Sequence, residues 1–304
     1  MFNREAREER EDRKEHKLVD GVLVIDKPQG LTSHDVVAVA RRAIGERRIG
    51  HTGTLDPLAT GVLPLACGRA TRLVRFLTAS DKEYQATVRF GMTTDSYDVT
   101  GAETSRSGLQ PDRETVTRAL ASLMGSYLQT PPAFSAKKVA GRRAYDMARR
   151  EQPVELSPVP VTVTTAELDA FTGDTAQVRL VCSAGFYVRA FAHSLGEITE
   201  TGACLEALRR TRSGEFTLEG ANTLEKLVNG APPVALVPMD RLLAALPTIM
   251  ISEEGRNRVS HGQEVEGRCG TDDWVRLMDG HGRLVAMARP GSRPGLLHPA
   301  IVLI

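Results

Sequence analysis

The stretch GHTGTLDPLATG, at positions 50–61, carries side chains that can do chemistry and has neither a helical nor a strand period. His51 and Asp56 can titrate, and three threonines supply hydroxyl groups. Asp56 precedes Pro57, which biases its backbone away from the α region and towards an extended conformation. Asp-Pro pairs also occur in ordinary polar turns. Presented from a rigid loop, however, a carboxylate can act as a nucleophile at an anomeric carbon.

Two tyrosines could contact the group on which Asp56 acts. Tyr84 lies in an alternating apolar and polar stretch, which predicts a strand with one buried face. Tyr187 precedes Arg189 by two residues, and on a regular helix these side chains would diverge by about 200°. A shared site therefore requires a strand-to-helix junction, for which Gly185 is well placed. Core packing is the alternative for both tyrosines, whereas the functional interpretation is stacking on an extruded base.

Basic side chains gather in three places in a chain whose net charge is only +1. Local clustering in a near-neutral chain favours a surface for phosphate groups. Each cluster taken alone is also typical of a solvated surface. The clusters are Arg41, Arg42, Arg47 and Arg48; then Lys137, Lys138, Arg142 and Arg143; and finally Arg209, Arg210 and Arg212.

The composition, 41% hydrophobic and 25% charged over 304 residues, is that of an ordinary soluble globular protein. The four cysteines lack zinc-site spacing, and there is no glycine-rich phosphate loop. The sequence therefore predicts a reaction that needs no metal and no cofactor. No apolar run reaches membrane-spanning length and no secretory signal is present, so we expect a cytoplasmic protein that does not contact a membrane.

The elements that must position these residues follow from sequence patterning. Residues 21–25 predict a buried strand, and a helix is expected from a cap at Thr32 or Ser33 to Gly45. Alternation and helical spacing predict further elements, which are strands near 84–90 and 178–182 and helices over 112–124 and 186–199.

Three parts of the chain differ in composition. Residues 1–17 alternate acids and bases and form a charged tail to which we assign no chemistry. Residues 18–245 are expected to form one large unit, from which a Pro-rich and basic segment at about 126–152 makes an exposed excursion. Short strand-like runs with hairpin signals predict a small β module over 246–304.

These motifs carry a family resemblance along most of the chain. GHTGTLDPLATGVLPLACGRATRL closely resembles the signature of the TruB-type tRNA pseudouridine synthases. LVDGVLVIDKPQGLTSHDVV, SDKEYQATVRFGMTTDSYDVTG and QTPPAFSAKKVAGRRAYDMAR resemble further blocks of that family. VCSAGFYVRAFAHSLGE is similar to its late motif, although Ala184 and Phe186 replace more polar residues. The guide-RNA-dependent relatives tend to read HSGTLDPKVTG, so HTGTLDPLATG favours the stand-alone tRNA enzymes.

The resemblance implies an α+β pseudouridine synthase fold. This is a large mixed, mainly antiparallel sheet flanked by helices, with a small C-terminal PUA-like β-barrel that binds RNA. It also implies conversion of the uridine at position 55 in the T-loop of tRNA to pseudouridine. The base would be flipped out, and its glycosidic bond cut and re-joined with the help of an Asp. The expected partner is tRNA, and we expect a monomer with no protein partner.

The resemblance also implies roles for single residues. Asp56 matches the nucleophile of the family, and Tyr84 matches the tyrosine that stacks on the target base. Arg189 matches the Arg that pairs with the catalytic carboxylate, and Tyr187 the Tyr that lines the flipped base. His51 matches the His that fills the T-loop where the base has left. Contacts with the RNA backbone are expected from Lys137, Lys138, Arg142, Arg143, Arg209 and Arg210.

Two other functions fit part of the sequence. A tRNA-binding folding helper with secondary catalysis is supported by the basic excursion and by the C-terminal module. A nucleoside or glycoside hydrolase would use Asp56 and would release free uracil. Only the synthase accounts for the long first motif together with the late Tyr-x-Arg pair.

Overall fold

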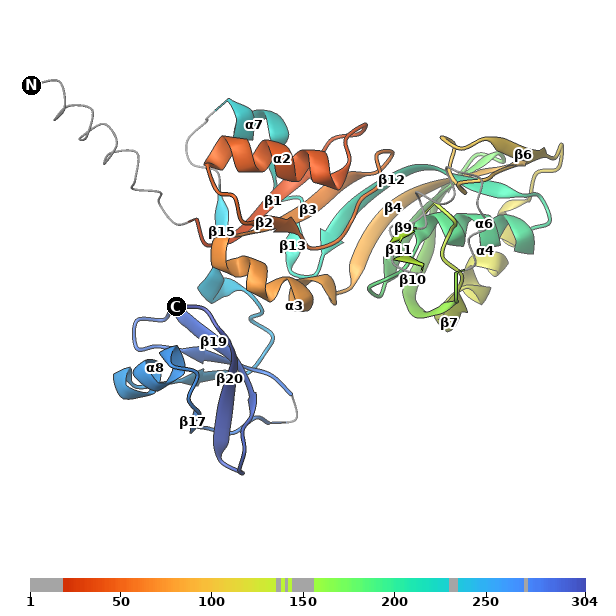
Figure 1. Ribbon diagram of the computed structural model, residues 1–304. Coiled ribbons are helices and arrows are strands. Elements are labelled where there is room, and N and C mark those ends of the chain that lie inside the picture. The colour runs from red at the N-terminus through yellow and green to blue at the C-terminus, as the bar shows by residue number, and fades with distance from the viewer. Residues whose placement is uncertain (1–18, 135–137, 140–141, 144–155, 230–234, 271–272) are drawn as a thin grey trace, which may run out of the picture.

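The computed structural model of this protein describes residues 19–134, 138–139, 142–143, 156–229, 235–270 and 273–304. These residues form a large and a small β-sheet, and Figure 1 shows the small sheet below one end of the large one. The predicted α+β class, with a large mixed sheet and a separate small β unit, is confirmed. None of the helices in these ranges is long and apolar enough to cross a membrane.

The large sheet is 11-stranded, with the order β14-β1-β3-β12-β4-β11-β10-β7 along its main path. Two neighbouring pairs, β1 with β14 and β3 with β12, are parallel, and the other pairs along this path are antiparallel. The path consists of β1 (Gly21–Lys27), β3 (Thr60–Cys67), β4 (Lys82–Phe90), β7 (Gly125–Gln129), β10 (Val159–Phe171), β11 (Thr175–Cys182), β12 (Ala203–Ser213) and β14 (Asn222–Thr223). Three short strands pair at its sides, β2 (Ile49–His51), β13 (Phe216–Thr217) and β15 (Leu236–Pro238).

Four helices pack on one face of this sheet and enclose the largest hydrophobic cluster, which includes Leu23, Leu63, Val88 and Phe191. These are α2 (Ser33–Ile44), α4 (Arg113–Ser122), α6 (Val188–Ile198) and α7 (Leu224–Val228). Figure 1 shows α2 and α7 together at one end of the sheet and α4 and α6 together at the other. The second cluster, on the opposite face, lies against η1 (Gly68–Leu73) and α3 (Val74–Thr78).

Local sequence signals explain where the helix α2 starts and stops. Thr32 caps it, and the Thr32 hydroxyl accepts a hydrogen bond from the Asp35 N–H while the Asp35 carboxylate accepts one from the Thr32 N–H. The helix ends at Gly45, as the sequence predicts. The strand β4 alternates as predicted, with Tyr84 on its buried face.

The connection from β7 to β10 covers most of the segment at about 126–152 for which an exposed excursion is predicted. Residues 125–129 pair with β10 and belong to the large sheet, and an excursion over the rest stays a prediction. Within that connection, β8 (Lys138–Val139) and β9 (Arg142–Arg143) pair antiparallel as a two-stranded sheet. Lys137 and the charged tail over 1–17 lie outside the described residues.

The small sheet has the order β16-β18-β19-β20-β17, and the helix α8 (Glu253–Ser260) lies beside it. Its strands are β16 (Thr248–Met250), β17 (Val265–Glu266), β18 (Val275–Met278), β19 (Leu284–Pro290) and β20 (Leu296–Val302). Met278, Leu284 and Leu303 share a hydrophobic cluster with Val24 and Leu73 of the larger unit. The two units are therefore in apolar contact, and a boundary near 245 stays a prediction. Three further short elements are the paired strands β5 (Met92–Thr94) and β6 (Glu103–Arg106) and the η2 turn (Met239–Arg241).

Candidate active site

The loop that carries Asp56 connects β2 to β3 and is fixed by the turn that follows β1 and by the first residue of α2. The Leu55 N–H donates to Ser33 Oγ at 2.8 Å, and the Ser33 hydroxyl donates back to the Leu55 carbonyl at 3.1 Å. The Gly30 N–H donates to the Pro57 carbonyl at 2.8 Å. Hydrogen bonds on both sides of Asp56 therefore hold its backbone, while its side chain stays 42% exposed.

Lys27, at the end of β1, is a fully buried cation beneath this loop. Its ammonium group donates to the carbonyls of Ala59 at 2.6 Å and Pro28 at 2.9 Å. Burial lowers the pKa of Lys27 to about 8, and the negative charge of Asp56 acts in the opposite direction. Lys27 therefore joins the turn after β1 to the loop that carries Asp56, and it leaves the exposed side of Asp56 open.

Arg210 is the second buried cation, and here the structure corrects the sequence analysis. The side chain is buried, with Nε donating to the Val62 carbonyl at 2.7 Å and Nη2 to the Gly53 carbonyl at 3.1 Å. Gly61 adjoins it with a φ of 101°, and a Cβ there would lie 2.2 Å from the Arg210 carbonyl oxygen. A surface contact with RNA phosphates was expected of Arg210. The donors of its guanidinium hold the loop that carries Asp56 instead.

Arg189 and Asp56 form the ion pair that the family resemblance implies. Arg189 Nε lies 2.9 Å from Asp56 Oδ2 and 3.7 Å from Asp98 Oδ2. Its other two nitrogens donate to the carbonyls of Ser96 at 3.0 Å and Phe134 at 2.8 Å. All sides of the guanidinium are thus occupied, which fixes the side chain in one orientation.

Asp98 is a functional candidate that the sequence analysis missed. The residue is buried, and its Oδ1 accepts hydrogen bonds from the Thr100 N–H at 2.9 Å and from the Ser96 hydroxyl at 3.0 Å. An Asp flanked at two residues' distance by Ser and Thr is a local signal for such a turn. The sequence carries no signal that this turn lies behind Arg189.

The strand-to-helix junction that a shared site requires is present at Tyr187. Gly185 takes a left-handed φ of 83°, and Tyr187 follows in an extended conformation with φ −112° and ψ 107°. Helix α6 begins only at Val188, so Arg189 is its second residue. The predicted helix start at 186 is therefore two residues early, because the junction occupies those positions.

The four predicted catalytic residues, Asp56, Tyr84, Tyr187 and Arg189, line one pocket of about 250 Å³. This volume lies below that of sites for drug-sized ligands, so it suits a single flat ring. The other residues of the lining are Gly53, Thr54, Leu55, Thr78, Lys82, Ser183, Gly185, Phe186, Val188, Leu208 and Arg210. In the described residues, no group of three or more His, Cys, Asp or Glu side chains is placed to hold a metal ion.

The walls of this pocket combine aromatic rings with one more buried cation. Burial raises the pKa of Tyr84, and the nearby Arg210 charge opposes the shift, so the phenol is neutral at physiological pH. Phe186, one of the departures from the family pattern, packs towards Phe191 with ring centroids 5.9 Å apart. Lys82 donates to the Thr78 carbonyl at 2.5 Å, and burial lowers its pKa to about 8.

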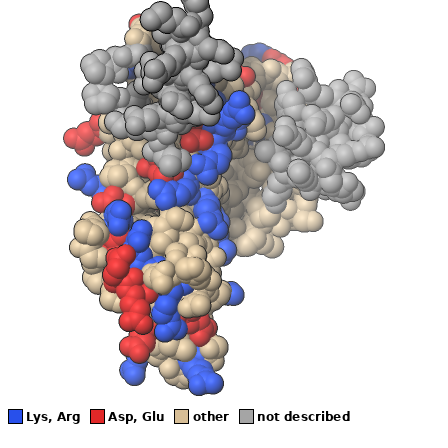
Figure 2. Space-filling model, turned by 60° about the vertical axis from the view of Figure 1, so that its left-hand side comes forward, with Lys and Arg blue, Asp and Glu red and all other residues tan. Residues whose placement is uncertain are grey.

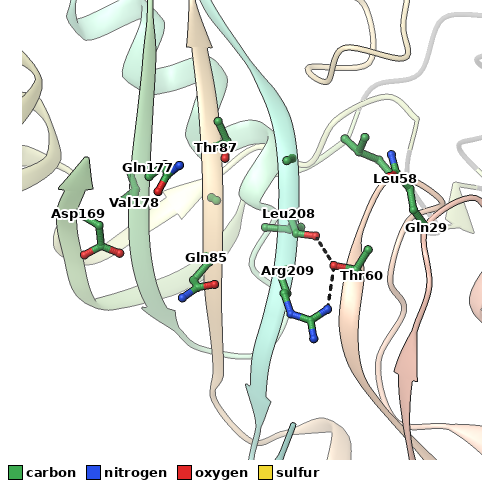
Figure 3. A pocket seen from close by; sticks show the side chains of 12 residues that line it. Gln29, Leu58, Thr60, Gln85, Thr87, Asp169, Gln177, Val178, Leu208 and Arg209 are labelled. Atoms are coloured by element: carbon green, nitrogen blue, oxygen red, sulfur yellow. Dashed lines mark hydrogen bonds between the residues drawn. The ribbon is translucent and has the colours of Figure 1, made fainter. Parts of the chain in front are cut away.

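Two further sequence candidates lie outside this pocket. His51 meets His34 edge to face, with ring centroids 5.3 Å apart, and burial and the His34 charge lower its pKa. Arg209 lies on the opposite face of the sheet from Arg210, because neighbouring strand residues point to opposite sides. It pairs with Asp26 at 2.8 Å and lines a larger pocket of about 410 Å³ that Figure 3 shows with Gln85, Thr87 and Gln177.

The basic residues are unevenly distributed over the surface. Figure 2 shows a band of Lys and Arg side chains across the upper part of one face, with a few Asp and Glu side chains among them, and a run of Asp and Glu side chains lower down. A local gathering of basic side chains agrees with anion binding by a chain of near-zero net charge. The RNA contacts expected of Lys138, Arg142 and Arg143 stay predictions, because only their backbone pairing is described.

Comparisons with known proteins agree with this geometry. The TruB family pseudouridylate synthase (N terminal domain) matches residues 41–188. The tRNA pseudouridine synthase B of Solibacter usitatus is 44% identical over 294 residues, which cover 94% of this chain and 100% of that protein. The tRNA pseudouridine synthase B of Aromatoleum aromaticum is 40% identical over 278 residues, which cover 90% of each protein.

Solved structures of ribonucleoprotein complexes contain chains with the same fold. An H/ACA ribonucleoprotein bound to a substrate RNA containing 2′-deoxyuridine matches with a TM-score of 0.73 and 25% identity, covering 95% of this chain and 86% of that one. An archaeal box H/ACA Nop10–Cbf5 complex matches with a TM-score of 0.72 and 26% identity, over 94% of this chain and 87% of that one. From its motifs, its pocket and these relatives, the chain belongs to the TruB family of pseudouridine synthases.

Proposed function

We propose that this chain converts the uridine at position 55 in the T-loop of tRNA to pseudouridine. The observation that carries the proposal is the ion pair of Asp56 and Arg189 beside a ring-sized pocket that Tyr84 and Tyr187 also line. The curated relatives that span the whole chain are named tRNA pseudouridine synthase B, which supports tRNA as the substrate.

The reaction needs no atoms from outside the substrate, except for an exchange of protons. The bond between N1 of the uracil and C1′ of the ribose breaks, and a bond from C5 to C1′ forms. The proton on C5 leaves, and N1 takes up a proton. Asp56 acts on the nucleotide as the nucleophile, because its carboxylate is both exposed and fixed. Arg189 orients that carboxylate through a charge-assisted hydrogen bond.

The detached uracil must be kept in place while it turns. A base inside a folded T-loop first has to be flipped out of its stack to reach the pocket. Tyr84, Tyr187 and Phe186 line the space that would receive it. Their apolar rings stack on a flat base and exclude water, so that the base re-joins the sugar and does not escape.

Binding of the RNA backbone is assigned to the basic surface. His51 would fill the T-loop position that the base leaves, and Lys137, Lys138, Arg142 and Arg143 would contact phosphates from the excursion. Arg209 keeps part of its exposure and can contribute on its own face of the sheet. These contacts predict that tRNA affinity falls steeply as the salt concentration rises.

The proposal is tested by incubating the protein with an unmodified tRNA transcript and mapping pseudouridine chemically. A matched transcript with cytidine at position 55 is the control. We expect one pseudouridine, at position 55, and no free uracil. Free uracil would instead identify a hydrolase, and an unmodified transcript that folds faster in the presence of the protein would identify a folding helper.

A further inference from the structure

Gln129, the last residue of β7, is attached to the backbone of Tyr187. Its side-chain oxygen accepts a hydrogen bond from the Tyr187 N–H at 2.8 Å, and its side-chain nitrogen donates to the Tyr187 carbonyl at 3.1 Å. Gln129 is only 5% exposed. One buried amide therefore pairs with both backbone polar groups of Tyr187, which is far away in the sequence, and the Tyr187 carbonyl also accepts a hydrogen bond from the Phe191 N–H at 3.1 Å.

The chemistry of this contact requires an amide. A primary amide presents a donor and an acceptor side by side, as a peptide group does in a strand. A carboxylate of the same shape offers acceptors only, and a methionine side chain offers neither a strong donor nor a strong acceptor. Gln129 thus acts as a substitute strand partner that holds Tyr187 extended, one residue before α6 begins.

The position of Tyr187 determines where two side chains of the pocket point. Tyr187 and Arg189 both line the pocket with Asp56, and Arg189 Nε lies 2.9 Å from Asp56 Oδ2. A change in the backbone at Tyr187 would turn its own ring and shift the first turn of α6. The segment after Gln129 makes a second contact there, because the Phe134 carbonyl accepts a hydrogen bond from Arg189.

We propose that Gln129 is a positioning residue for the isomerisation, which aims Tyr187 and Arg189 at Asp56 by pairing with the Tyr187 backbone. Gln129 is not part of the pocket lining, so it acts through Tyr187. This inference rests on the proposed function. The inference adds that β7, the strand before the basic segment, is attached through Gln129 to the strand-to-helix junction at Tyr187.

Two variants test the amide directly. Gln129→Glu keeps the shape, and its neutral acid form again offers one donor and one acceptor, whereas its ionised form loses the donor. Gln129→Met removes both at every pH. Single-turnover rates on tRNA, tRNA affinity and melting temperature are measured for both variants and the wild type at about pH 8 and about pH 5.5, on either side of the pKa expected for a buried glutamic acid.

At the higher pH, we expect both variants to lose at least about tenfold in single-turnover rate, since small misplacements of reacting groups have large effects. Affinity for tRNA should stay within about threefold, because a buried residue touches no phosphate. At the lower pH, the rate of Gln129→Glu, divided by that of the wild type, should recover at least about fivefold as the carboxyl group takes up a proton. The same ratio for Gln129→Met should not change.

The recovery can be assigned to position 129 by comparing Gln129→Glu with Gln129→Met, which has no titrating group there. Burial raises the pKa values of Tyr127 and Cys182 to about 12, so both stay neutral in this range. Gln129→Met keeps the same neighbouring residues as Gln129→Glu, including Arg189 and His193 on α6, so it is the control for any pH response that does not arise at position 129. The carboxyl group introduced by Gln129→Glu would thus be the one new titrating group.

Equal rates in the wild type and Gln129→Met would overturn the inference. So would a pH response shared by Gln129→Glu and Gln129→Met, because a recovery in a variant that cannot take up a proton at position 129 would not come from a restored hydrogen-bond donor there. A wild-type protein that forms no pseudouridine would instead refute the proposed function. The two failures are therefore distinct.

Discussion

The Arg189 guanidinium lies 2.9 Å from the Asp56 carboxylate, and the exposed fractions of the two side chains are 7% and 42%. The buried cation is fixed by its further contacts with Ser96, Phe134 and Asp98. The exposed carboxylate is thus oriented from behind and remains open to a substrate. This division of roles between the two side chains predicts that substitution of Arg189 slows the chemical step more than it weakens RNA binding.

Replacing Arg189 tests that division. Arg189→Ala should lower the single-turnover rate by at least about 100-fold, and Arg189→Lys should recover only part of it, because an ammonium group lacks the planar fork that makes the four contacts. The dissociation constant for tRNA should change less than about threefold. The rates come from rapid mixing with excess enzyme, and the affinities from filter binding. Parallel losses in rate and affinity would argue against the orienting role.

Tyr97 and His193 form a ring contact next to Asp98, the residue that lies behind the Arg189 guanidinium. Tyr97 precedes Asp98 and has a left-handed backbone with φ 63°, and its ring stacks on that of His193 with centroids 4.0 Å and planes 6° apart. We expect a coupling of about 0.5–1.5 kcal/mol between Tyr97→Asn and His193→Ala, as for other aromatic pairs. Asn tolerates a left-handed backbone, so it removes the ring without adding strain. Urea denaturation of the two single variants and the double variant gives the coupling, and strictly additive effects would show that the stack contributes nothing.

Lys27 predicts a pH dependence of stability on the alkaline side. Its pKa is lowered from 10.5 to about 8 in the folded protein, so the unfolded chain binds more protons between these values. Stability therefore rises with pH in this window, as the cost of burying the charge disappears. Relative to Lys27→Met, the wild type should gain on the order of 1–3 kcal/mol in free energy of unfolding between about pH 7.5 and 10. Denaturant titrations across that range measure the difference, and parallel curves for the two proteins would rule the effect out.

The sequence predicted those parts of the site that depend on local patterns. The cap at Thr32, the alternation around Tyr84 and the junction at Gly185 each follow from residues within a few positions of one another. The motif around Asp56 also indicated the family, and the family resemblance implied that Arg189 pairs with Asp56. Such signals are readable because backbone preferences act over short distances.

The parts that were missed or wrong depend on contacts between distant segments. Arg210 belongs to a basic cluster in sequence, but the pairing of β12 with β3 and β4 buries it under the loop that carries Asp56. Gln129 and Asp98 are polar residues whose partners, Tyr187 and Arg189, lie on α6 or at its start. No periodicity in a single sequence specifies which polar residues the fold will bring together.

The central claim is that Asp56 is the nucleophile in an isomerisation, and tritium release tests it most directly. A tRNA transcript labelled with tritium at uridine C5 is incubated with the wild type and with Asp56→Asn, and tRNA affinity is measured for both. We predict release by the wild type, none by Asp56→Asn, and affinities within about threefold of each other, since the substitution keeps the shape of the side chain. Release by Asp56→Asn at a rate close to that of the wild type would contradict the account.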